Sequence, residues 1–142
     1  MDYSKTGLQL TERFEGLKLT AYRDVAGVLT IGYGHTGSDV VPGLTITAEQ
    51  AEQLLAGDIA NAVDAVNGLV TVDLGQSQFD SLVDFVFNVG RRAFANSTLL
   101  ALLNSGDYDG AADEFEKWSH AGGKLVAGLL RRRQSEKDQF EA

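Results

Sequence analysis

The chain has 142 residues, 44% of them hydrophobic and 23% charged, which is typical of one globular domain with a buried core. It contains no cysteine, which excludes disulfides and thiolate metal sites, and its net charge of −8 argues against a nucleic-acid partner. Because we find neither the apolar core of a signal peptide nor a membrane-spanning stretch, we expect synthesis in a cytoplasm without stable membrane association.

The first predicted element is a helix over residues 3–15, where apolar side chains recur at steps of three and four. Gly16 is well suited to end it. Residues 20–36 have a shorter period, which indicates a β-hairpin or a small sheet. If Gly27 supplies the left-handed residue of a three-residue loop, Asp24 pairs with Val28 across the hairpin.

The rest of the chain is predicted to be mainly helical. Thr47 and Gln50 form a capping box at the start of a long helix that ends near residue 68. The segment 76–90 is apolar nearly all round, which is typical of a helix wrapped by others. Further helices are predicted over 97–106, with Ser97 as its cap, and over 109–123 and 127–140. The expected fold is α+β and mainly helical, as a single domain with a small sheet lobe (16–46), a connecting helix (47–68) and a larger helical lobe (69–142).

Glu15 is a candidate general acid. It lies in the last turn of the first helix, where unpaired carbonyls and the negative end of the helix dipole disfavour another negative charge. It also borders the apolar face of that helix, so we expect a raised pKa, which a general acid needs at neutral pH. The alternative is an exposed glutamate at a helix end with no function.

Asp24 and Thr30 gain significance from the predicted hairpin. Alone, an aspartate at a turn is commonplace, because its side chain bonds the backbone two residues on. In the hairpin, however, Thr30 becomes its diagonal neighbour on the same face, about 7–8 Å away along the backbone. One carboxyl acting as an acid, a second kept ionised and a hydroxyl between them form the arrangement of a glycoside hydrolase.

The segment "FEGLKLTAYRDVAGVLTIGYGHT" closely resembles the catalytic stretch of the phage-type lysozymes, or endolysins, of glycoside hydrolase family 24. Later segments, including "DSLVDFVFNVGRRAFANSTLLALLN" and "GLLRRRQSEKDQF", resemble that family in the same order. The resemblance implies a lysozyme-like fold, with the 1–15 helix near the cleft, and a muramidase that needs no cofactor or metal. It implies that Glu15 is the proton donor, Asp24 the second carboxylate and Thr30 the residue that positions water. The alternatives are a lytic transglycosylase and a non-catalytic glycan-binding or phage structural module.

The resemblance also places the end of the 76–90 helix at the floor of the cleft. Phe87 and Asn88 are therefore candidate sugar contacts, although plain core and helix-end roles explain them equally well. Weaker candidates of the same kind are Thr36, Ser97 and Thr98. Trp118 is expected in the core rather than as a platform for a sugar ring.

Two residues are expected to support the site. His35 has only one other histidine in the chain, so a structural role is favoured over a metal ligand. We expect it to pair with Asp58, which would raise the pKa of the histidine and lower that of the aspartate. Arg133 falls on the apolar face of the last helix and needs a buried carboxylate, either Glu15 or a neighbour in the cleft, or an unrelated structural acid.

The resemblance implies partners as well. The substrate would be peptidoglycan, and a holin would open the inner membrane so that an enzyme made in the host cytoplasm reaches the cell wall. We expect a monomer that inverts configuration, with the wider carboxyl spacing that leaves room for a water.

Overall fold

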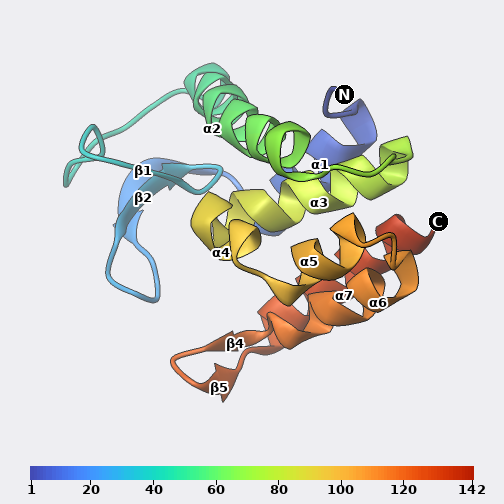
Figure 1. The fold of residues 1–142 in the computed structure, drawn as a ribbon. Coiled ribbons are helices and arrows are strands. Elements are labelled where there is room, and N and C mark those ends of the chain that lie inside the picture. The colour runs from blue at the N-terminus through green and yellow to red at the C-terminus, as the bar shows by residue number, and fades with distance from the viewer. The chain divides into compact units, whose positions relative to one another are not determined.

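The computed structural model describes residues 1–142 (Figure 1). Its helices are α1 (Lys5–Glu15), α2 (Ala48–Leu69), α3 (Gln76–Val89), α4 (Arg91–Ala95), α5 (Thr98–Asn104), α6 (Tyr108–Glu114), the 3₁₀ helix η1 (Phe115–Lys117) and α7 (Ala127–Glu141). Its strands are β1 (Lys18–Arg23), β2 (Leu29–Gly32), β3 (His35–Thr36), β4 (His120–Ala121) and β5 (Lys124–Leu125). The predicted α+β, mainly helical class is confirmed. None of the helices combines the length and apolar character that a membrane span requires.

The chain forms two compact units. The sheet unit comprises Gln9–Asn61, and the helical unit comprises Met1–Leu8 together with Ala62–Ala142. The chain passes from one unit to the other within α1 and again within α2, so each of these helices contributes residues to both.

The sheet unit contains a three-stranded antiparallel sheet in the order β1–β2–β3. Its core includes Ile31 of β2 and Ala51 of α2, both fully buried. Gly32 lets the strand approach the helix, since a Cβ there would lie only 3.3 Å from the Cβ of Ala51. The predicted capping box at the start of α2 is confirmed, because Thr47 and Gln50 exchange side chain–backbone hydrogen bonds of 2.9 and 3.1 Å.

The helical unit is built around α3, in which every residue from Phe79 to Val86 is buried. This confirms the prediction of a helix wrapped by others. The Phe85 ring receives the rings of Phe94, Phe115 and Trp118 edge-on, with centroids 5.4–6.2 Å apart. Trp118 is half-buried rather than fully in the core, with its ring packed on that of Phe85.

The helix predicted over 109–123 is wrong in its C-terminal part. Helix α6 ends at Glu114, one 3₁₀ turn follows, and β4 and β5 then form an antiparallel hairpin. Its two-residue loop is Gly122–Gly123, with φ values of +58° and +78°. Positive φ at both central residues is the requirement of a type I′ hairpin turn and is incompatible with a right-handed helix.

Candidate active site

Glu15 is the last residue of α1, and Gly16 ends the helix with a φ of +68°. The side chain of Glu15 is half-buried and its carboxylate lies against the backbone of Gly34. A Cβ at Gly34 would collide with this carboxylate, coming within 3.0 Å of its carbon. The glycine therefore provides the space in which the candidate acid sits, a role that sequence reasoning missed.

Asp24 begins the turn between β1 and β2. Its Oδ1 accepts hydrogen bonds from the backbone N–H groups of Ala26 and Val28, both at 2.9 Å, and its own N–H donates to the Val28 carbonyl at 3.0 Å. Gly27 adopts a φ of +81°, so the predicted loop and the pairing of Asp24 with Val28 are confirmed. Because both N–H groups bond to Oδ1, the carboxylate is fixed in orientation, and Oδ2 has no protein hydrogen-bond partner.

Thr30 lies on β2 directly opposite Tyr22 of β1. Residues two apart on a strand share a face, so Asp24 and Thr30 lie on the same face, as predicted. The Thr30 hydroxyl donates to the carbonyl of Val28 at 2.9 Å, and the residue is only 4% exposed. Since its hydrogen is already used, this oxygen can only accept from a molecule placed beside it.

Tyr22 is half-buried on the same face. Burial and then the negative charges of Glu15 and Asp24 raise the pKa of its phenol above the ordinary value of 10.0. The phenol of Tyr22 thus interacts electrostatically with both carboxylates. The alternation of the hairpin placed Tyr22 on this face but gave no reason to assign it a function.

His35 supports the sheet next to this face. Its Nδ1 lies 2.7 Å from Oδ2 of Asp58, so the predicted contact is confirmed, and its Nε2 lies 2.9 Å from Oδ2 of Asp39, which was not predicted. Desolvation lowers the pKa of His35, but the bonds to Asp58 and Asp39 outweigh it and raise that pKa above 6.5. The hydrogen bond from His35 in turn lowers the pKa of Asp39.

Arg133 is fully buried in the helical unit, as predicted, and its carboxylate partner is Glu136, a structural acid one turn along α7. Their Nε and Oε1 atoms are 2.7 Å apart. The guanidinium also donates through Nη2 to Oδ1 of Asn88 at 2.8 Å and lies over the Phe85 ring. This contact fixes the amide of the exposed Asn88 at the end of α3 and leaves its NH₂ group free to donate.

The neighbouring arginine is buried too, which the helical period did not predict. Arg132 is 6% exposed and forms a bidentate pair with Asp84 of α3, at 2.9 and 3.0 Å. Planar bidentate pairing is the geometry that best compensates an arginine for burial.

The remaining candidates for sugar contacts differ in what their side chains are free to do. Ser97 is buried, and its hydroxyl accepts from the N–H of Leu100 and donates to the Phe94 carbonyl, so it acts as the predicted helix cap. Phe87 is half-buried, while Thr36 and Thr98 are exposed. Thr36 lies opposite Thr30 in the sheet. No group of histidine, aspartate and glutamate side chains is arranged to hold a metal ion.

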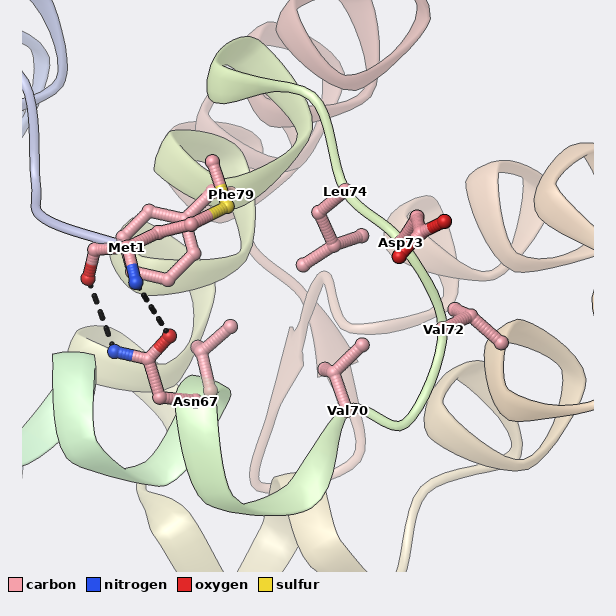
Figure 2. Close-up of a pocket in the computed structure, with 8 residues that line it drawn as sticks. Met1, Asn67, Val70, Val72, Asp73, Leu74 and Phe79 are labelled. Carbon is pink, nitrogen blue, oxygen red and sulfur yellow. Dashed lines mark hydrogen bonds between the residues drawn. The ribbon is translucent and has the colours of Figure 1, made fainter.

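A pocket of about 410 Å³ lies in the helical unit, but none of the predicted site residues lines it. Figure 2 shows its lining around Met1, Val70, Leu74 and Phe79, with Asn67 bonded to the backbone of Met1. Its lining contains a single carboxylate, that of Asp73, and so lacks a carboxylate pair.

A small antiparallel sheet with a helical unit, a glutamate at a helix end and an aspartate and threonine on one hairpin face define a lysozyme-like protein. The model of the phage lysozyme family matches residues 12–136. The chain therefore belongs to the phage lysozyme family.

Individual relatives and solved structures support membership of the same family. The chain is 49% identical to an endolysin of Acyrthosiphon pisum secondary endosymbiont phage 1, covering 100% of this chain and 99% of the relative. It is also 49% identical to an endolysin of Bacillus phage B103, covering 99% of this chain. It spans about half the length of that relative and of a second Bacillus phage endolysin, 54% and 56%. Among solved structures, the muramidase domain of SpmX from Asticaccaulis excentricus superposes with a TM-score of 0.91 at 41% identity, covering 99% and 98% of the two chains.

Proposed function

We propose that the protein is an endolysin that hydrolyses the β-1,4 bond between N-acetylmuramic acid and N-acetylglucosamine in peptidoglycan. The observation that carries this proposal is the carboxylate pair of the sheet unit. Glu15 is seated against Gly34, and Asp24 is fixed through one oxygen while the other has no protein partner. The names of the relatives, endolysin and muramidase, support the same activity.

In this proposal each residue of the pair has one task. Glu15, the carboxyl at the end of α1, acts as the general acid and protonates the glycosidic oxygen as that oxygen leaves the anomeric carbon. A water donates one hydrogen to Oδ2 of Asp24 and the other to the hydroxyl oxygen of Thr30, which has already given its own hydrogen to Val28. Both hydrogens of that water are then occupied, so an oxygen lone pair is directed at the anomeric carbon. Asp24 takes up the proton as the new bond forms.

Residues of the helical unit, together with Thr36 of the sheet unit, are proposed to hold the sugars. Asn88 is suited to donate to an N-acetyl carbonyl, since Arg133 already binds its amide oxygen. Phe87, Thr36 and Thr98 are proposed as further contacts. Ser97 is proposed only as a support for its helix, because its hydroxyl is used twice within the fold. His35 and Asp58 are proposed to brace the sheet rather than to touch substrate.

The test is digestion of purified peptidoglycan followed by mass spectrometry of the fragments, together with loss of turbidity of permeabilised Gram-negative cells. Fragments with new reducing ends support hydrolysis. Anhydro ends would identify a lytic transglycosylase, and binding without fragments would identify a non-catalytic module. In the same assays, the variant Glu15→Gln should release far fewer fragments than the unaltered chain. Its matched control is Glu12→Gln, which changes a glutamate one turn earlier on α1.

We further propose that the protein acts as a monomer and that a holin gives it access to the wall from the host cytoplasm. The support is the family resemblance. Expression of this chain alone should leave cells intact until the membrane is permeabilised, and prompt lysis without permeabilisation would contradict the need for a holin.

A further inference from the structure

The distribution of charge along the chain is uneven in one place. Between Lys117 and Ser135 there is no aspartate or glutamate, although acids outnumber bases by 20 to 12 in the whole chain, and five of the 12 bases fall there. Three of the five have acidic partners in the structure, because Lys117 pairs with Glu114, Arg132 with Asp84 and Arg133 with Glu136. The other two, Lys124 and Arg131, are exposed and have no acidic partner.

These two cations belong to the β4–β5 hairpin and to the first turns of α7 that follow it. Lys124 follows the tight Gly122–Gly123 turn at the tip of the β4–β5 hairpin, which extends beyond the helices in Figure 1. The base of the hairpin is closed by a hydrogen bond of 2.9 Å from the N–H of Val126 to the Ser119 carbonyl. Arg131 lies in the first turns of α7, directly after the hairpin, with its guanidinium 3.7 Å from where a Cβ of Gly128 would be.

The hairpin lies at the same end of the helical unit as Asn88. Arg133 of α7 contacts Asn88 at the end of α3. Arg132 contacts Asp84, which lies one turn before Asn88 on α3. Glu136, the partner of Arg133, lies one turn further along α7. Within this unit, the second turn of α7 therefore meets the end of α3, and the hairpin leads directly into α7. Trp118, just before β4, packs edge-on against Phe85, which ties the base of the hairpin to α3.

The strand that returns from the tip carries apolar side chains next to its lysine. Val126, two residues after Lys124 and so on the same face of the hairpin, is 37% exposed, and Leu125 on the opposite face is 60% exposed. A ligand for this surface should carry carboxylates together with small apolar side chains, and it should be attached to a glycan bound at Asn88. The stem peptides of peptidoglycan fit this description, because they combine alanines with free carboxylates and branch from the glycan.

We propose that the β4–β5 hairpin, through Lys124 and together with Arg131 of the helix that follows it, binds the carboxylates of the stem peptide attached to the glycan. This inference rests on the proposed function and extends it from the sugars to the peptide. The remainder of this acidic molecule repels an anionic polymer, so the hairpin supplies local attraction that the net charge of −8 does not.

The test measures binding of peptidoglycan strands in two forms, one with free stem carboxylates and one with those carboxylates amidated. Binding is measured at low salt with Glu15→Gln as the background, so that strands are not cleaved. Adding Lys124→Gln should raise the Kd for the free-carboxylate strands about three-fold, the size expected of an exposed ion pair, and leave the Kd for amidated strands unchanged. Lys124→Arg should restore binding, and Arg131→Gln should weaken it in the same selective way.

The matched control is Lys5→Gln, which removes one positive charge from an exposed lysine of α1 in the same unit. It changes the net charge equally and should leave both Kd values unchanged. Equal losses on free and amidated strands, or an effect of Lys5→Gln as large as that of Lys124→Gln, would overturn the inference. Cleavage of both strand forms by the unaltered chain tests the proposed function separately, so the two failures are distinct.

Discussion

At the scale of single residues, Glu15 is the side chain on which the proposed hydrolysis depends most directly. Glu15→Gln keeps the shape of the side chain but removes the proton that the leaving oxygen needs. We expect kcat to fall by about 10²–10⁴-fold, the usual contribution of a positioned general acid. The free energy of unfolding should be unchanged or slightly higher, because the end of α1 loses a charge that its dipole disfavours. Reducing-end release and urea unfolding measure the two quantities, and a variant with more than a tenth of the original rate would exclude Glu15 as the acid.

Gly34→Ala tests whether the seat of Glu15 matters. The φ of +76° at Gly34 makes an alanine there cost about 1–2 kcal/mol, and its Cβ would also displace the Glu15 carboxylate. Gly43→Ala is the matched control, since Gly43 has a φ of +83° and nothing lies within 4 Å of its added Cβ. Both variants should lose similar stability, but only Gly34→Ala should also lose kcat, by ten-fold or more. Equal kcat values in the two variants would show that Gly34 does not position the acid.

At the scale of elements, the bonds of His35 join the end of the sheet, the following loop and α2. Because its pKa is raised, the contribution of His35 to the free energy of unfolding is complete below 6.5 and is lost as pH rises through the folded value. Asp39 has a lowered pKa, so its contribution is present above 3.8 and is lost as pH falls through its folded value. The pairing should therefore stabilise most between these limits.

An NMR titration should give His35 a pKa above 6.5 in the folded protein. Asp39→Asn should lower this pKa while the bond to Asp58 remains, and Glu49→Gln, which changes an exposed acid in the first turn of α2, should not. A His35 pKa at or below 6.5 in the unaltered protein would contradict the pairing.

The α3–α7 contact contains a second titrating group. Burial and the hydrogen bond with Asp84 hold the pKa of Glu136 well above 4.5, although Arg133 and Arg132 act against them. A raised folded pKa means that stability is lost as pH rises from 4.5 through the folded value. Glu136→Gln removes this loss. The unfolding free energy of the variant should therefore rise relative to that of the unaltered protein as pH rises. Urea unfolding from pH 4 to 9 measures it, with the exposed Glu141→Gln as control, and a difference that is constant with pH would contradict the assignment.

At the scale of the whole molecule, the stereochemistry of the product tests how the carboxylates work together. Asp24 is held by two N–H groups in the hairpin, and Thr30 beside it can only accept a hydrogen. This arrangement favours a water between Asp24 and the sugar, for which inverting enzymes leave about 6.5–9.5 Å between their carboxyls. Proton NMR of fresh product should show the α-anomer first. An initial β-anomer would make Asp24 a nucleophile.

The sequence by itself determined the features that depend on local chemistry. The capping box of Thr47 and Gln50, the register of the hairpin at Asp24 and the buried face of α3 all follow from short-range geometry and periodicity. The contact of His35 with Asp58 was also predicted, with the help of the family resemblance. The β4–β5 hairpin was missed because the helical pattern before it was extended too far, although the Gly122–Gly123 pair is itself a signal for a tight turn.

Only the tertiary structure decided which groups meet across elements. The place of Gly34 under Glu15, the second acid at His35 and the choice of Glu136 as the partner of Arg133 all depend on how strands, loops and helices pack. A helical period identifies the face on which an arginine lies, but it does not say which carboxylate shares its burial. For Arg132, a bidentate bond to Asp84 from another helix made burial favourable on a side of α7 that the period had left to solvent. Desolvation and pairing are set by three-dimensional neighbours, which a one-dimensional pattern does not contain.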